Sequence, residues 1–251
     1  MSEQQPILVM VGGVGELFQG DLDLGRVAVE RLAAEGLGDH VVVEDLHYGA
    51  VAVAQRLQEL KPSHLVLVGG VVRGRPPASV ERRRPAPAAM SPAEFQLAVG
   101  DAVVGYVSID LVVEVGAGLG VLPARTVAIE MEPVLVGPSD RLSPEGDAAV
   151  DEILALVRAE VRRAPLVELA ERIAAHGVPA DHSPAAATLV ELVAAVLELG
   201  DGGRFGRVWV LRDRLRRQID AGETGESMDA LDWALWWALL EELDKVLAAE
   251  L

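Results

Sequence analysis

Short apolar runs alternate with amphipathic helical segments over the first 163 residues, and this alternation restricts the fold more than any other feature. The runs are short and bounded by turn-forming residues, which predicts buried strands at residues 7–11, 40–44, 64–68 and 126–132. Apolar residues recur with helical spacing at residues 24–34, 50–60 and 109–119. Strands that alternate with helices predict an α/β fold, with a mostly parallel twisted sheet sandwiched by helices.

The strand pattern ends near residue 163, and the rest of the chain is expected to be helical. Ser143, Pro144 and Glu145 predict a helix start, because they supply a hydroxyl cap, a proline at the first helical position and an acid near the positive pole. We expect this helix to reach Arg163 and to end before Pro165. Further helices are expected at residues 166–175, 184–199, 208–219 and 228–251. The chain should therefore contain an α/β domain at residues 1–163 and a small all-α domain at residues 164–251.

Three of the four tryptophans lie close together in the last expected helix. Trp233, Trp236 and Trp237 have the spacing i, i+3 and i+4, so they share one face of that helix. Such a face forms either part of a core or a docking surface, and the sequence leaves both open.

The composition narrows the classes of partner. A formal charge of −17 argues against a nucleic-acid binder, because phosphate contacts need clustered Lys and Arg. The basic run from Arg82 to Arg84 lies among prolines and is expected to be a solvated loop. The absence of cysteine excludes disulfides and thiolate metal sites and fits a reducing compartment. Neither a secretory signal nor an apolar run of about 18 residues is present, so we expect a cytoplasmic protein without a membrane segment.

A glycine-rich turn follows the first expected strand, at residues 11–15, and reads VGGVG. A dinucleotide-binding loop would read G-x-G-x-x-G, but Phe18 stands in the place of the final glycine. The chain also lacks the G-K-[ST] of a phosphate-binding loop and the G-x-S-x-G of a nucleophile elbow. The simpler interpretation is a tight turn at the carboxyl end of a strand.

Three sequence blocks occur in the order and at the spacing of one protein family. They read GVGELFQGDLDLG at residues 13–25, LVLVGGVVRGRPPASV at residues 65–80, and PVLVGPSDRLSPE at residues 133–145. They resemble the nickel–iron hydrogenase maturation endopeptidases, whose patterns are G-x-G-N-x-L-x-x-D-[DE]-x-x-G, D-A-x-x-x-G-x-x-P-G-x-V and a passage ending in L-S-P. The resemblance covers residues 6–163 and implies an α/β sandwich that removes a C-terminal peptide from the hydrogenase large subunit.

The resemblance also implies a site for recognising nickel, and the ligand positions are altered here. The family uses an acid in the first loop, an aspartate at the end of the third strand and a histidine at a helix start. These positions correspond to Leu22, Gly69 and Asp110. Leucine and glycine offer no side-chain donor, and a carboxylate differs from imidazole in hardness and charge. The family's first-loop asparagine is Glu16, so nickel capture by the family's route is expected to be lost.

A rebuilt metal site is the alternative. Asp21 and Asp23 flank Leu22, and with Asp110 they could hold nickel or a hard divalent cation such as magnesium. The simpler interpretation is that Asp21 or Asp23 caps the helix near residue 24, and that Asp110 competes with Ser108 to cap the next helix. Among the histidines, His47 is the one that could approach the carboxyl end of the sheet. His176 and His182, together with Asp181, are expected in a surface turn rather than a metal site.

The leading interpretation is a non-catalytic relative of the maturation endopeptidase that acts as a partner-binding accessory factor in hydrogenase assembly. The partner would be a protein, either a hydrogenase large subunit or a maturation factor, and an oligomer is left open. The cleft candidates for this contact are Asp21, Asp23, Arg73 and Asp110, without any cofactor. The alternatives are an active peptidase with a rebuilt metal site, or an acidic scaffold unrelated to hydrogenases.

Overall fold

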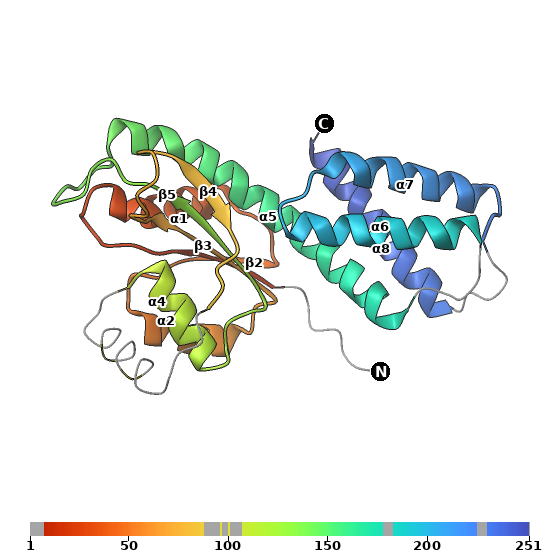
Figure 1. Cartoon of the computed structure of the whole chain (residues 1–251), viewed down its shortest axis with the longest axis horizontal. Helices are drawn as coiled ribbons and strands as arrows, with labels where there is room; N and C mark the ends of the chain where they lie inside the picture. Colours follow the sequence, from red (N-terminus) through yellow and green to blue (C-terminus); the bar gives the residue numbers. More distant parts are fainter. Residues whose placement is uncertain are drawn as a thin grey trace. The chain divides into compact units, whose positions relative to one another are not determined.

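The computed structural model describes residues 8–87, 96, 100, 107–177, 183–224 and 230–250. The chain divides into two compact units, Met1–Val161 and Arg162–Leu251. The first is an α/β unit and the second is helical, and each is described by itself below (Figure 1).

A five-stranded sheet forms the centre of the α/β unit. Its strands are β1 (Val9–Gly13), β2 (Val41–Asp45), β3 (His64–Gly70), β4 (Val80–Arg83) and β5 (Arg125–Met131). The order is β2-β1-β3-β5-β4, in which β4 alone is antiparallel to its neighbour. The expected mostly parallel sheet is confirmed, and the four expected strands lie within two residues of their predicted bounds.

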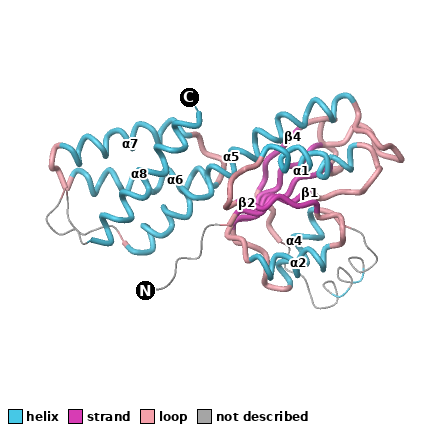
Figure 2. Tube along the Cα trace, turned by 180° about the vertical axis from the view of Figure 1, so that it is seen from behind, coloured by secondary structure: helices cyan, strands magenta, loops and turns pink. Residues whose placement is uncertain are grey.

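Helices cover both faces of this sheet, as the alternating pattern predicts. They are α1 (Leu24–Glu35), α2 (Ala50–Leu60), α4 (Ile109–Gly118) and the first part of α5 (Pro144–His176), with a 3₁₀ turn η1 (Asp21–Asp23) before α1. Figure 2 shows α2 and α4 on one face, and α1 and α5 on the other. Met10, Leu65 and Leu67 pack against α2 and α4 in one buried cluster. This arrangement brings the carboxyl ends of β1, β3 and β5 to a common edge.

The basic run is not the solvated loop that its composition indicates, because Arg82 and Arg83 belong to β4. Arg82 donates to Glu160 at 2.8 and 3.0 Å, and Arg83 donates to Glu130 at 2.7 Å. β4 lies at the edge of the sheet, where charged side chains are compatible with a strand. The sequence of β4 does not alternate between apolar and polar residues, so no local pattern predicts this strand. The strand is stabilised instead by its pairing with β5 and by ion pairs with distant carboxylates.

The expectation that α5 ends before Pro165 is also wrong. Ser143 caps the helix as predicted, with its hydroxyl accepting from the Gly146 amide at 2.9 Å, but the helix continues through Pro165 to His176. Proline fixes a backbone angle that a helix accepts and removes one hydrogen bond. Ala164 and Leu166 on either side are at most 1% exposed, so burial of the continuing apolar face offsets that loss.

The second unit contains the four helices that the sequence predicts. The end of α5 is followed by α6 (Pro184–Gly200), α7 (Phe205–Asp220) and α8 (Ala230–Glu250). Trp236 is 1% exposed in the core of this unit, whereas Trp237 is 40% exposed and stacks on Trp233 at 6.4 Å. The tryptophan face is therefore partly core and partly surface. Within the described residues, no helix combines the length and apolar character that spanning a bilayer requires.

Candidate functional site

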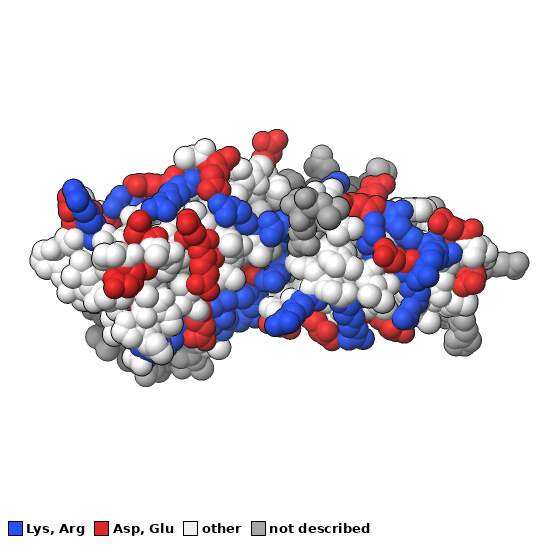
Figure 3. All heavy atoms as spheres, turned by 90° about the horizontal axis from the view of Figure 1, so that it is seen from above, with Lys and Arg blue, Asp and Glu red and all other residues white. Residues whose placement is uncertain are grey.

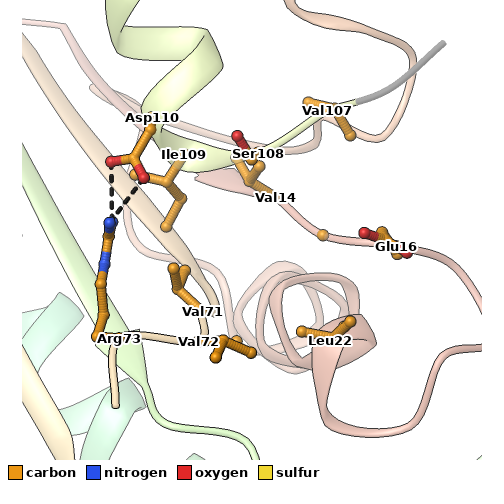
Figure 4. Close-up of a pocket in the computed structure, with 12 residues that line it drawn as sticks. Val14, Glu16, Leu22, Val71, Val72, Arg73, Val107, Ser108, Ile109 and Asp110 are labelled. Atoms are coloured by element: carbon orange, nitrogen blue, oxygen red, sulfur yellow. Dashed lines mark hydrogen bonds and ion pairs between the residues drawn. The ribbon is translucent and has the colours of Figure 1, made fainter. Parts of the chain in front are cut away.

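A pocket of about 250 Å³ opens at the carboxyl end of β1 and β3. Its walls come from the first loop, the loop after β3 and the start of α4 (Figure 4). The lining combines apolar and polar groups in equal measure: Val14, Gly15, Glu16, Leu22, Gly70, Val71, Val72, Arg73, Val107, Ser108, Ile109 and Asp110. Ligand sites of open α/β sheets lie at this edge, so the pocket is the candidate functional site.

Arg73 and Asp110 meet at the mouth of this pocket. The two terminal guanidinium nitrogens of Arg73 donate to the two carboxylate oxygens of Asp110 at 2.7 and 2.8 Å (Figure 4). Arg83 adds a third bond to Asp110 at 2.9 Å. Ser108, not Asp110, caps α4 by accepting from the Leu111 amide at 3.2 Å. The bonds from Arg73 hold the pKa of Asp110 below its usual value, against the opposing effect of burial. The carboxylate is therefore charged and already neutralised by two arginines.

Glu130 is the centre of the same network, and it was not among the sequence candidates. Its side chain is 0% exposed and accepts from Arg73 at 2.8 and 3.1 Å, from Arg83 at 2.7 Å and from Arg75 at 3.3 Å. Burial raises the pKa of Glu130, but the hydrogen bonds from Arg73 and Arg83 outweigh it and leave that pKa below its usual value. One sequence signal could have identified Glu130: it is a carboxylate inside the apolar run of residues 126–132. A charge in a buried strand needs a partner, so its presence there indicates an ion pair.

Glu132 fixes the loop that carries two of these arginines. Its carboxylate accepts from the backbone amides of Arg73 at 2.8 Å and Gly74 at 3.1 Å. Its backbone carbonyl accepts from the amide of Ala78 at 2.8 Å, which closes the loop against β5. The arginines that face Asp110 and Glu130 are thus held by the backbone as well as by their own charges.

Replacing Ala78 with glycine is expected to stabilise the α/β unit by about 0.5–1 kcal/mol. Glycine avoids the steric cost of a left-handed backbone conformation, and this gain exceeds the extra conformational entropy that glycine loses on folding. Ala78 has φ 61°, a conformation that strains a residue with a Cβ. The pattern that the chain resembles has glycine at this position. Urea denaturation followed by circular dichroism measures the change. The control is Gly74→Ala at φ 77°, where a Cβ meets nothing within 4 Å and the sign should reverse. Equal midpoints for all three proteins would contradict the expected strain.

Asp21 and Asp23 are buried, at 0% and 3% exposed, and their oxygens are bonded within the chain. Asp21 accepts from the amides of Val134, Leu135 and Ser143 at 2.7–2.9 Å, and from the Ser143 hydroxyl at 2.8 Å. Burial raises the pKa of Asp21, but these bonds outweigh it and leave the pKa below its usual value.

The expectation that one of these aspartates caps α1 through its side chain is wrong. Asp23 stands at the helix start without a capping bond and instead accepts from Arg26 at 2.7 Å and from the Phe18 amide at 3.3 Å. Asp21 ties the first loop to the start of α5, because its partners come from the loop after β5 and from Ser143. Both aspartates therefore hold the first loop in place, and neither lines the pocket.

The ligand positions that the resemblance implies do not fit a metal ion. Leu22 lines the pocket with an apolar side chain. A Cβ at Gly69 would lie 2.4 Å from the backbone oxygen of Val14, so no side chain fits at this position without moving the first loop. Asp110 is held by two arginines. Elsewhere, His47 bonds to Asp45 at 2.8 Å, and the turn containing Asp181 and His182 lies outside the described residues. Among the described residues, no group of three His, Cys, Asp or Glu side chains could hold a metal ion.

An exposed apolar surface adjoins the first loop, and the sequence analysis did not identify it. We define the apolar rim as Phe18, Val134, Leu135 and Val136, which are 61%, 43%, 39% and 57% exposed. The two segments are joined by the Ser139 amide, which donates to the Phe18 carbonyl at 2.9 Å, and by the Asp21 amide, which donates to the Leu135 carbonyl at 2.9 Å. Phe18 has φ 58°, a rare conformation for a bulky residue. Exposed apolar groups gathered in this way are typical of a protein contact.

Comparisons with known proteins find similarity in structure rather than in sequence. No protein-family model matches the chain, and no curated protein matches its sequence. Among solved structures, a hydrogenase 2 maturation peptidase from Thaumarchaeota archaeon SCGC_AB-539-E09 is 23% identical, covering 60% of this chain and 95% of that one, with a TM-score of 0.41. The hydrogenase maturating endopeptidase HybD from E. coli is 21% identical, covering 62% and 93%, with a TM-score of 0.46. The [NiFe] hydrogenase maturation protease HycI from Thermococcus kodakarensis KOD1 is 15% identical, covering 63% and 94%, with a TM-score of 0.45. The chain is thus similar over about three fifths of its length to solved hydrogenase maturation peptidases.

Proposed function

We propose that this protein is a non-catalytic relative of the hydrogenase maturation peptidases, which binds a protein partner during nickel–iron hydrogenase assembly and cleaves nothing. The observation that carries the proposal is the state of the three implied ligand positions. Leu22 has no donor, Gly69 has no room for one, and the Asp110 carboxylate is occupied by Arg73 and Arg83. Two of the three sequence blocks that resemble the peptidase family contribute residues to this same pocket.

The charges around Asp110 support this interpretation in addition to the steric argument. A carboxylate that holds a divalent cation must direct its lone pairs at the ion, and both Asp110 oxygens instead accept from guanidinium groups. A metal ion could bind Asp110 only if this carboxylate left Arg73 and Arg83. The two arginines would then lose a carboxylate partner, and the cost of that loss opposes metal binding. The guanidinium groups therefore supply the positive charge that a metal ion would supply in an active peptidase.

The partner would bind across the pocket and the apolar rim. Val14, Leu22, Val71 and Ile109 give the pocket apolar walls, and the rim extends apolar surface next to the first loop. A partner segment that fills the pocket with an apolar side chain and lies on the rim would bury both surfaces. By the resemblance, that partner is the large subunit of a nickel–iron hydrogenase or another factor bound to it.

The test mixes the purified full-length chain with the precursor of a hydrogenase large subunit, with and without nickel. We expect a complex on size-exclusion chromatography and no shortening of the precursor. Phe18→Ser/Val136→Ser should weaken binding by about tenfold or more, since it removes two exposed apolar anchors. The control is Val190→Ser on α6, which removes a valine that is 49% exposed, against 57% for Val136, far along the sequence from the rim.

Two outcomes would overturn the proposed function, and a third would overturn the assignment of the contact to the rim. Shortening of the precursor by the purified chain would establish an active peptidase with a rebuilt site. Failure to bind any precursor or maturation factor would favour a scaffold unrelated to hydrogenases. Equal loss of binding in the rim variant and in Val190→Ser would mean that the rim is not the contact surface.

A further inference from the structure

Helix α7 is basic in an otherwise acidic chain. It carries five arginines and two aspartates, a formal charge of +3, whereas the whole chain carries −17. Figure 3 shows Lys and Arg side chains gathered over the helical unit, with carboxylates beside them. Neither the pocket nor the proposed partner contact at the α/β unit uses this helix.

The inward face of α7 accounts for only part of this charge. Val208, Leu211 and Leu215 are buried in the core of the helical unit. Arg212 and Arg216 both pair with Asp244 of α8, and Arg216 also lies over the ring of Trp237 at 6.0 Å. These two arginines join α7 to α8, which leaves the other three for a different role.

The remaining arginines lie along one outward face, which we call the α7 stripe: Arg207, Val210, Arg214 and Arg217. Their spacing of i, i+3, i+7 and i+10 places them on one side of the helix over about 15 Å. Val210 is 59% exposed, and the side chains of Arg207 and Arg214 are 57% and 45% exposed. The stripe thus presents cationic groups on either side of an exposed apolar residue.

Among the residues that the structure describes, the stripe has only weak partners. Arg207 lies 3.6 Å from Glu198 and Arg214 lies 3.4 Å from Glu191, and both carboxylates are at least half exposed. Arg217 donates to the backbone carbonyl of Asp213 at 3.2 Å. Exposed pairs of this kind contribute little to stability and are readily exchanged. The guanidinium groups can therefore turn to a partner without cost to the core of the unit.

We propose that the α7 stripe binds an acidic amphipathic helix of a partner protein. Guanidinium groups form paired hydrogen bonds with carboxylates, and Val210 offers an apolar contact at the centre of the stripe. Three arginines on a chain of charge −17 are too few to hold a nucleic-acid backbone, which the rest of the surface repels. One exposed valine is likewise too little apolar surface for a lipid interface. Charge complementarity therefore favours a short acidic protein segment.

The test measures binding of the full-length protein to a fluorescent acidic peptide of about sixteen residues, long enough to cover the stripe as a helix. The peptide carries glutamates on one face around a central leucine. We expect Arg207→Glu/Arg214→Glu/Arg217→Glu to weaken binding by about tenfold or more, through loss and reversal of charge-assisted bonds. Added salt should weaken the wild-type binding, because the contact is ionic and exposed.

A matched control separates the stripe from net charge. Lys61→Glu/Arg141→Glu/Lys245→Glu changes the total charge by the same amount at exposed positions outside the stripe, and should bind the peptide within about twofold of wild type. Equal weakening in both triple variants, or no binding to the wild-type protein, would overturn the proposal. Tighter binding to a DNA duplex, or to phosphatidylcholine vesicles containing phosphatidylserine, would overturn it as well. Unchanged circular dichroism of both variants establishes that they remain folded.

Discussion

Asp21→Ala is expected to destabilise the α/β unit by about 3 kcal/mol or more, because it removes a buried charged acceptor and leaves several donors unsatisfied. The carboxylate accepts three backbone amides and one hydroxyl, and a methyl group accepts none of them. The loop after β5 and the start of α5 would lose their common anchor. Urea denaturation followed by far-ultraviolet circular dichroism measures the change.

The control for Asp21 is Asp140→Ala, at an exposed position in the same loop. It should change stability by less than about 0.5 kcal/mol, as surface substitutions usually do. Tryptophan fluorescence reports separately on the helical unit, because all four tryptophans lie there. A loss of stability for Asp140→Ala as large as that for Asp21→Ala would contradict the role assigned to the buried carboxylate.

The effect of Asp21 should depend on pH in a defined direction. Its pKa in the folded protein lies below the usual value of 3.8, so the folded state favours the ionised form. The stabilisation is therefore fully present above the unfolded pKa and is lost as the pH falls towards the folded pKa. The stability difference between wild type and Asp21→Ala should be constant near neutral pH and shrink below pH 3.8. If this stability difference grew as the pH fell, the predicted direction of the pKa shift of Asp21 would be contradicted.

Local patterns predicted most of the fold because hydrophobic periodicity is a local property. The predicted bounds of α2 match the structure, and the start of β3 at His64 is also the predicted one. The edge strand β4 was missed, since no alternation of apolar residues marks it and its pairing with β5 depends on a distant segment. Pro165 predicts a helix end, but the helix continues, since a proline in the sequence says nothing about the burial that stabilises the residues after it.

The candidate site was predictable in its place but not in its chemistry. The sequence blocks predict Leu22 and Arg73 near one sheet edge, the implied helix start adds Asp110, and all three line the pocket. What the sequence could not reveal is which charges meet. Glu130 and Arg73 are 57 residues apart in the chain, and Asp21 and Ser143 are 122 apart. Side-chain pairs of such separation follow from the folded arrangement alone, so an aspartate that looks like a metal ligand in sequence can be a structural acceptor.

Glu130→Gln is expected to destabilise the α/β unit by about 3–5 kcal/mol, because removing one partner of a buried ion network leaves the opposite charges without compensation. Three guanidinium groups, those of Arg73, Arg75 and Arg83, point at this fully buried carboxylate. Glutamine keeps the size of the side chain but loses its charge and one acceptor site. The loss should appear in the urea midpoint measured by circular dichroism.

The control for Glu130 is Glu81→Gln, which changes the same kind of group on the same network. Glu81 pairs with Arg75 at 2.7 Å, but its side chain is 54% exposed, so its loss should cost less than about 1 kcal/mol. If the two variants were equally stable, the arginines around Asp110 would be held by the surface rather than by Glu130. Asp110 could then be released at little cost, and the argument against a metal ion at this site would lose its electrostatic part. A large difference between the two variants would instead mean that the charge of Glu130 fixes Arg73 and Arg83 against Asp110, which keeps the pocket closed to a cation.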